Sequence, residues 1–342
     1  MRITINDLAR ETGYSKTTVS FAFNDPDQIS AQARSKILAA ADRLGYIPDP
    51  VARSLSRRKV GSIGLLLPQS IPFSLQNPYM VQLISGVGDV CNANGLSLTM
   101  LPPHRGDLLK SARRAAVDGF ITIGLEPEDE VVRAIRNRHI PFVIIDGPPH
   151  DGLPSVRVDD RGAARMAMQH VLERGHRSIA ILMLEERQEE EDEAYSGIGR
   201  ERMAGYGDAL ESVGSSLASR DVVVFREPCS VAGGEEACRL ILHEHPDVSA
   251  VVCMSDVLAL GVYRECQHAG YRIPDRISVV GFDDIVEAEL LNPPLTTVHQ
   301  PAEEKGRVAG SVLVDMIADK QVQEFTELPC SLVDRSSVAT LG

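Results

Sequence analysis

The sequence predicts an N-terminal all-α helix-turn-helix head, followed by an α/β core of two doubly wound parallel-sheet lobes. Helix-start and helix-stop signals fill the first 46 residues, and from Gly61 onward short apolar runs alternate with helical segments. Charge divides near the same point. Residues 1–59 carry ten Lys/Arg and six Asp/Glu, net +4, whereas the remainder carries 25 and 42, net −17. A basic head on an acidic body is typical of a nucleic-acid binder with a separate second domain.

Three short helices account for the head. Thr4 with Asp7 three residues later is a helix-capping pattern, and Ser15 caps a second helix. A third helix is predicted over Ser30–Leu44, and a glycine follows the first and the third. Two short helices joined by a turn, with a third completing a small core, form a layout that places the start of the second helix in the DNA major groove. The same pattern also occurs in proteins without a DNA role.

Eight β-rich runs alternate with seven helical segments in the core. The predicted strands are Ile63–Leu67, Leu96–Leu101, Gly119–Ile123, Phe142–Ile145, Ile179–Leu184, Val222–Phe225, Ala250–Met254 and Ile277–Val280. The predicted helices are Met80–Asn94, Asp107–Val117, Glu128–Arg138, Ala163–Arg174, Arg200–Ser212, Val231–His243 and Val257–Ala269. Continuous apolar strands alternating with helices indicate parallel sheets covered on both faces. The number of units favours two lobes, divided near Val158–Arg161.

Several classes of protein are disfavoured. The apolar runs are far shorter than a membrane span, and the N-terminus has no apolar signal region. The six cysteines form no CxxC pair, which suits buried thiols in a reducing cytoplasm. The His243-x-His245 pair is interpreted as a solvated helix end, so we expect no metal and no cofactor. Because phosphate-binding loops, GxSxG and a catalytic Ser/His/Asp or Cys/His set are missing, we expect no enzyme.

Particular strings in the head identify a family. ITINDLARETGYSKTTVSFAFND and ISAQARSKILAAADRLGYIPDPVARSL resemble the lactose-repressor (LacI/GalR) family of bacterial transcription regulators, and the resemblance continues through nearly the whole chain. It implies a head over 1–46 and a hinge helix or linker over 47–60. It also implies a first lobe over 61–158 with 290–320 and a second over 159–289 with 321–340, with a ligand cleft between them as in sugar-binding periplasmic proteins.

The family register implies which head residues meet DNA. Lys16, Thr17 and Phe21 fall at base-reading positions, where Lys donates to guanine, Thr takes either role and Phe touches a thymine methyl. Many relatives carry Arg at the Phe21 position, so the operator half-site should differ from the common one. The alternative for Phe21 is a core residue. Phosphate contacts are implied for Thr18, Asn24 and Ser30.

The stretch DPVARSLSRRK follows the head. Asp49 and Pro50 form a helix start, but about two turns of helix are unstable alone, so we expect the segment to order only on DNA. Leu55 is the residue expected to open a base step in the minor groove, and Arg53 is expected to meet phosphates or the groove floor. The alternative is a plain linker.

By the same register, five residues contact a small-molecule effector: Asp146, Arg202, Ser230, Ser255 and Asp283. Carboxylates and a guanidinium suit a polyol because each forms paired hydrogen bonds with vicinal hydroxyls. Asp256 and Asp284 are interpreted as capping or hinge residues instead. Ser255 replaces a frequent Asn, and Cys229 lies where relatives often place an aromatic side chain, so the identity of the sugar stays open.

These expectations combine into one function. We expect a ligand-responsive repressor that binds a near-palindromic double-stranded DNA operator as a homodimer and is released by a small sugar or glycoside between the lobes. The tetramer-forming tail of the lactose repressor is missing from the sequence. The alternatives are a corepressor-dependent regulator that binds a purine-like ligand, and a non-regulatory solute-binding or sugar-processing protein. The effector, the operator and the regulated genes are not determined by the sequence.

Overall fold

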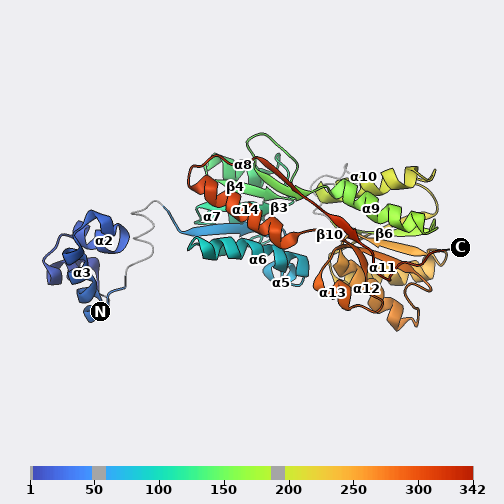
Figure 1. The fold of residues 1–342 in the computed structure, drawn as a ribbon, viewed down its shortest axis with the longest axis horizontal. Helices are drawn as coiled ribbons and strands as arrows, with labels where there is room; N and C mark the ends of the chain where they lie inside the picture. Colours follow the sequence, from blue (N-terminus) through green and yellow to red (C-terminus); the bar gives the residue numbers. More distant parts are fainter. Residues whose placement is uncertain (1–2, 48–58, 186–196, 342) are drawn as a thin grey trace. The chain divides into compact units, whose positions relative to one another are not determined.

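The computed structural model describes residues 3–47, 59–185 and 197–341. The chain divides into two compact units, Met1–Gly61 and Ser62–Gly342, which are called the head and the core below (Figure 1). Each unit has its own hydrophobic centre and is described by itself.

The head consists of α1 (Ile5–Thr12), α2 (Lys16–Asn24), the 3-10 helix η1 (Pro26–Gln28) and α3 (Ala31–Leu44). The predicted caps are confirmed: the hydroxyls of Thr4 and Ser15 accept hydrogen bonds from backbone N–H groups in the first turns. Ser30, which was not predicted as a cap, caps α3 in the same way. Gly13 and Gly45 take the left-handed conformation at the two predicted helix ends. The buried centre of the head is formed by Leu8, Val19, Ala22, Ile37, Ala40 and Ala41.

Two six-stranded sheets form the core. The first has the order β11-β5-β4-β3-β1-β2 and the second β12-β10-β9-β8-β6-β7. All pairings are parallel except that between β10 and β12. The first sheet contains β1 (Ser62–Leu66), β2 (Ser97–Leu101), β3 (Gly119–Ile123), β4 (Phe142–Ile145), β5 (Ser155–Val158) and β11 (Phe325–Leu328). The second contains β6 (Ile179–Leu184), β7 (Val222–Glu227), β8 (Ala250–Cys253), β9 (Ser278–Asp283), β10 (Thr296–His299) and β12 (Ser331–Val333).

Helices cover both faces of each sheet (Figure 1). The first lobe carries α5 (Ile71–Ser74), α6 (Pro78–Ala93), α7 (Leu108–Arg114), α8 (Glu130–Asn137) and α14 (Ala302–Ile317). The second carries α9 (Asp160–Glu173), α10 (Gly197–Glu211), α11 (Val231–Glu244), α12 (Asp256–His268) and α13 (Val286–Leu290). Helices α6, α14, α11 and α12 contribute to one buried cluster that continues from the first lobe into the second. The predicted fold class, an all-α head and two doubly wound lobes, is confirmed.

The chain passes between the lobes at places that differ from the expected limits. β10 pairs with β9, so residues 296–299 lie in the second lobe, although 290–320 were expected in the first. The return to the first lobe comes with α14, and β11 still pairs with β5 in that lobe. Residues 325–328 were expected in the second lobe, which the chain re-enters only at β12. Strands of three or four residues depend on neighbours distant in sequence, so a local pattern does not locate them.

Glycines allow two helices of the first lobe to pack closely. A Cβ atom at Gly86 of α6 would collide with the carbonyl of Glu303, and one at Gly306 of α14 would collide with the carbonyl of Leu83. Glycine therefore lets the two backbones touch. This contact sets the position of Lys305, the neighbour of Gly306, against the start of α6.

None of the described helices combines the length and apolar character that a bilayer-spanning segment needs. Within the same residues, no group of three or more His, Cys, Asp or Glu side chains has a geometry that could hold a metal ion.

Candidate functional site

One face of α2 is free of the head's core. Helical spacing of about 100° per residue puts Thr17 and Phe21 on the side away from the buried Val19, with Lys16 at the edge of that side in the first turn. Lys16 and Thr17 are exposed and Phe21 is half-buried. The sequence-predicted base-reading residues thus share one outward face at the start of α2.

The two phenylalanines of α2 differ in their surroundings. Phe23 packs against the head's buried cluster, and its ring centroid lies 5.6 Å from that of Tyr46. Phe21 does not belong to that cluster. This favours the surface interpretation of Phe21 over the core alternative.

The residues with implied phosphate contacts occupy helix ends. The Thr18 hydroxyl lies 2.9 Å from the capping hydroxyl of Ser15, and Ser30 accepts a bond of 3.2 Å from the N–H of Ala33. The amide of Asn24 donates to the hydroxyl of Ser20 at 3.1 Å. Helix starts present N–H groups that favour anions, so the positions of Thr18 and Ser30 are compatible with phosphate contacts. Asn24 is the last residue of α2, and all three contacts stay predictions. Arg53 and Leu55 lie outside the described residues.

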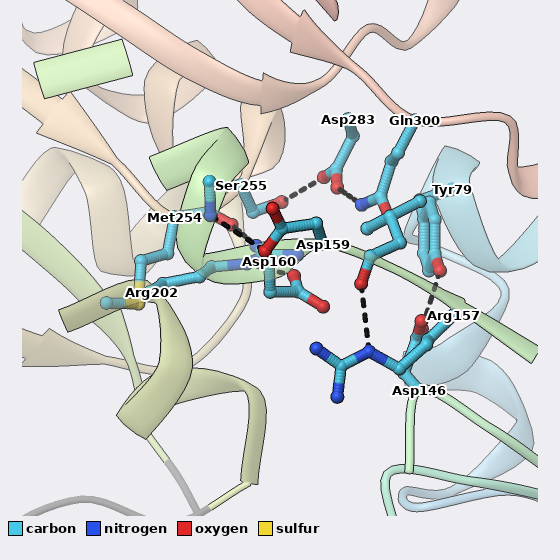
Figure 2. Close-up of polar contacts among 12 residues, drawn as sticks. Tyr79, Asp146, Arg157, Asp159, Asp160, Arg202, Met254, Ser255, Asp283 and Gln300 are labelled. Atoms are coloured by element: carbon cyan, nitrogen blue, oxygen red, sulfur yellow. Dashed lines mark hydrogen bonds and ion pairs between the residues drawn. The ribbon is translucent and has the colours of Figure 1, made fainter. Parts of the chain in front are cut away.

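Carboxylates in the core gather where parallel strands end. Asp146 directly follows β4 with a φ of 57°, and Asp283 closes β9 with a φ of 132°. Both conformations are strained for residues with a Cβ atom, and such strain is frequent at binding sites. Because the carboxyl ends of both sheets meet at the lobe junction, two residues far apart in the sequence come into one region (Figure 2).

Lys305 binds Asp146 inside the first lobe. Its Nζ donates to Asp146 Oδ1 at 2.5 Å, and Tyr79 Oη donates to Oδ2 of the same carboxylate at 2.9 Å. The Lys305 side chain is fully buried, and that of Asp146 is 3% exposed. Burial, followed by the nearby Asp146 charge, raises the pKa of Tyr79 well above its ordinary value, so its hydroxyl stays a donor. Both oxygens of the predicted effector carboxylate are therefore engaged within the protein.

A chain of hydrogen bonds continues into the second lobe, and Figure 2 shows its part from Gln300 through Asp283 to Ser255. Lys305 Nζ donates to Gln300 Oε1 at 2.7 Å, and Gln300 Nε2 donates to Asp283 Oδ1 at 2.5 Å. Ser255 Oγ donates to Asp283 Oδ2 at 2.8 Å. Burial raises the pKa of Asp283 to about 6, although a nearby guanidinium and these two bonds oppose the shift. We call Tyr79, Asp146, Ser255, Asp283, Gln300 and Lys305 the junction network.

A second contact joins the lobes. Asn77 Nδ2 donates to the sulfur of Cys229 at 3.5 Å, and the Cys229 thiol donates to Ser255 Oγ, also at 3.5 Å. Asn77 caps α6 of the first lobe, whereas Cys229 precedes α11 of the second. Cys229 thus contacts the opposite lobe.

Arg202 is held within the second lobe beside the junction network. Its Nε donates to Asp160 Oδ1 at 2.9 Å, and Nη1 donates to the carbonyl of Met254 at 2.5 Å. The guanidinium lies 3.5 Å from the centroid of the Phe282 ring. Both charged side chains are 5% exposed. Burial raises the pKa of Asp160, and Arg202 opposes this shift.

Three further residues have structural contacts. Asp256 accepts bonds from Thr297 Oγ1 and the N–H of Ile285, and Asp284 pairs with Arg335 at 2.8 Å. These contacts agree with the capping or hinge role expected for both carboxylates. Ser230 caps α11 through the N–H of Gly233, and its effector contact stays a prediction.

Sequence reasoning missed Lys305, Gln300 and Asp160. A signal for Lys305 existed: it occupies the stripe of α14 that also contains the buried Ala302, Ala309 and Leu313. A lysine in an apolar stripe marks a buried cation that needs a partner. The helix itself was not predicted, so the stripe was not recognised.

Comparisons with known proteins identify the families of the head and of the core. The profile of bacterial regulatory proteins of the lacI family matches residues 4–49, and that of a periplasmic binding protein-like domain matches residues 168–338. A helix-turn-helix-type transcriptional regulator of Mycolicibacterium smegmatis is 36% identical over 332 residues, covering 91% of this chain and 90% of the relative. The transcriptional repressor PurR of Vibrio atlanticus is 32% identical, covering 99% of each chain.

Solved structures give the same result. The lac repressor dimer bound to operator and the anti-inducer ONPF matches with a TM-score of 0.79 and 25% identity, covering 99% of this chain and 100% of that one. The complex of the transcriptional regulator CelR with cellobiose matches with a TM-score of 0.70 and 27% identity, covering 98% and 100%. With the head, the two lobes and these relatives in agreement, the chain belongs to the lacI family of bacterial regulatory proteins and is a ligand-responsive, DNA-binding transcription regulator.

Proposed function

We propose that this protein is a repressor that binds a near-palindromic operator as a homodimer and is released by a small neutral sugar or glycoside bound between the lobes. The observation that carries the proposal is the gathering of carboxylate, guanidinium, hydroxyl and amide groups at one lobe junction. Such groups form paired hydrogen bonds with vicinal hydroxyls. The cellobiose complex of CelR supports a sugar as the ligand class.

Charge balance at the junction supports a neutral ligand. Lys305 pairs with Asp146, and Arg202 pairs with Asp160. A cationic ligand would meet two buried cations, and an anionic one would meet the carboxylates, including Asp283. A neutral polyol avoids both repulsions.

Exposed apolar side chains support a dimer of the core. On α13, Val286 is 68% and Leu290 77% exposed. Near the start of α6, Leu75 and Val81 are 43% and 44% exposed. A second copy of this chain would cover such side chains, and two-fold symmetry would match two half-sites of an operator.

The exposed face of α2 supports base reading by Lys16, Thr17 and Phe21. We also propose that Thr18, Asn24 and Ser30 contact phosphates. Arg53 and Leu55 are proposed to act as hinge residues that contact DNA. We propose a cytoplasmic location, because the proposed target of the protein is operator DNA. We propose no catalytic activity, because its relatives act as transcription regulators.

The test is operator binding by the full-length chain. A near-palindrome is selected from random duplexes at low salt, and its affinity is measured with ribose, cellobiose, hypoxanthine and no ligand. We expect tight binding without ligand and a loss of affinity with a sugar. Absence of DNA binding under every condition would refute the proposal. Lys36→Ala is the matched control for Lys16→Ala, because Lys36 is an exposed lysine of α3 outside the predicted base-reading face.

A second candidate is a corepressor-dependent regulator that binds a purine. The PurR relative favours it. In the same measurement this candidate requires that hypoxanthine increases operator affinity, whereas the sugar-released repressor requires no purine. The sign of the ligand effect therefore separates the two.

A further inference from the structure

Lys305 stands apart from the other lysines of the described chain, because it alone is buried. A buried ammonium group is costly unless it is paired and its donors are satisfied. Nζ has three donors, and three acceptors surround it: Asp146 at 2.5 Å, Gln300 at 2.7 Å and Tyr79 at 3.1 Å. The cation is therefore saturated without any ligand.

These bonds connect the two lobes. Lys305 and Asp146 belong to the first lobe, whereas Asp283 ends a strand of the second. Gln300 bridges them, because it accepts from Lys305 and donates to Asp283. A more exposed ion pair also joins the lobes: Arg200 of α10 pairs with Glu126 of the first lobe at 3.2 Å. The connection from Lys305 through Gln300 to Asp283, in contrast, is buried.

Lys305 also occupies a position where an effector is expected to act. A polyol that reaches Asp146 has to compete with an ammonium and a phenol that already fill both carboxylate oxygens. Opening the lobes without a ligand would separate Gln300 from one of its partners and replace a direct hydrogen bond in a dry site by a weaker one with water.

We propose that Lys305 is a built-in cation that keeps the two lobes closed when no effector is present. This role rests on the proposed function, in which an effector changes lobe closure. It makes Lys305 of α14 the residue that holds the lobes closed when no effector is bound. Lys305 is a positioning residue: it acts on the second lobe through Gln300.

Cys229 provides a reporter that needs neither DNA nor an effector. Its thiol contacts Asn77 across the lobe junction, and burial raises its pKa to about 11. In the closed form, alkylation by N-ethylmaleimide should be slow. Cys229 is half-buried in the closed form, and opening exposes its thiol further, returns its pKa toward the ordinary value and accelerates the reaction.

The experiment measures alkylation of the full-length protein by peptide mass spectrometry, without ligand. Lys305→Met removes the cation at similar volume, and Gln300→Met keeps the Lys305–Asp146 pair but removes the bridge to Asp283. Lys110→Met is the matched control, because Lys110 is an exposed lysine paired with Asp107 in the same lobe. We expect Cys229 to react about tenfold faster in both junction variants than in the control.

Cys238 separates lobe opening from unfolding. It is fully buried inside the second lobe, where its sulfur lies 3.7 Å from that of Cys266. Lobe opening leaves its alkylation slow, and a merely structural role of Lys305 would raise the rates of Cys229 and Cys238 together. Equal Cys229 rates in Gln300→Met and Lys110→Met, or parallel acceleration of Cys238, would overturn the proposal. The operator measurement tests the proposed function independently, since alkylation involves no DNA.

Discussion

The face of α2 and the junction network differ in how far their polar side chains are exposed to solvent. Lys16 and Thr17 are exposed, whereas Lys305, Gln300 and Asp283 are buried and hydrogen-bonded to one another. A surface for DNA has to be accessible and cationic, because phosphates and base edges come from outside. A junction that responds to a small molecule has to hold its polar groups in place before the ligand arrives. Substitutions at α2 should therefore alter DNA binding, whereas those at the junction should alter stability and lobe closure.

The largest expected effect breaks the buried pair beside the junction. Arg202→Met leaves Asp160 buried without its cation, so the free energy of unfolding of the core should fall by about 3–5 kcal/mol. Urea denaturation measures it. Arg161→Met is the control, because its pair with Asp208 is exposed and screened by solvent and should contribute much less to stability. Similar losses in both variants would contradict the buried role of Arg202.

The next largest expected effect is a pH dependence of the free energy of unfolding that comes from Asp256. Burial, followed by the Asp283 charge, raises the pKa of Asp256 to about 7, well above the value of an unfolded aspartate. The folded state then binds more protons than the unfolded state, so this group's contribution to stability is present at low pH and is lost as pH rises from about 4 to about 7.

Asp256→Asn should remove that dependence. Relative to the variant, the wild-type protein should lose roughly 2 kcal/mol of unfolding free energy between pH 5 and pH 7.5. Urea titrations at both pH values measure it. A wild-type protein that gained stability relative to the variant over this interval would show that Asp256 is ionised in the folded state.

The smallest expected effects concern α2. Lys16→Ala should weaken operator binding by about 1–3 kcal/mol, and Phe21→Ala should relax the base preference at one position of each half-site. Neither should change the thermal stability of the head appreciably, because neither side chain belongs to its buried cluster. Fluorescence anisotropy with operator variants measures both. Loss of stability without a change in base preference would make Phe21 a core residue after all.

Elements with strong local signals were predicted accurately. The strands Gly119–Ile123, Phe142–Ile145 and Ile179–Leu184 have the expected limits, since they are apolar runs buried on both faces. The capping residues of the head were also correct, because a cap depends on three or four neighbouring residues. β10 and β11 were missed: both are short, and TTVH and FTEL have no clear period, so their pairing with β9 and β5 creates them.

The candidate sites divide in the same way. Family register placed Asp146, Ser255 and Asp283 at effector positions, and the fold brings them to one junction. It did not reveal the role of Lys305, which lies more than 150 residues beyond Asp146 in the sequence. Lys305 donates hydrogen bonds both to the Asp146 carboxylate and to Gln300, which in turn binds Asp283. A pairing over such a separation leaves no mark in the local sequence.

By itself, the sequence determined the head, the alternation of strands and helices, the charge division and the family, because caps, periodicity and motifs are local properties of the chain. The places where the chain crosses between the lobes, and the groups that already satisfy the predicted effector carboxylates, depend on contacts that exist only in the folded structure. The physical reason is that a buried charge is tolerated only beside its partners. Close packing of α14 on α6 supplies those partners for Lys305, and no stretch of sequence contains that contact.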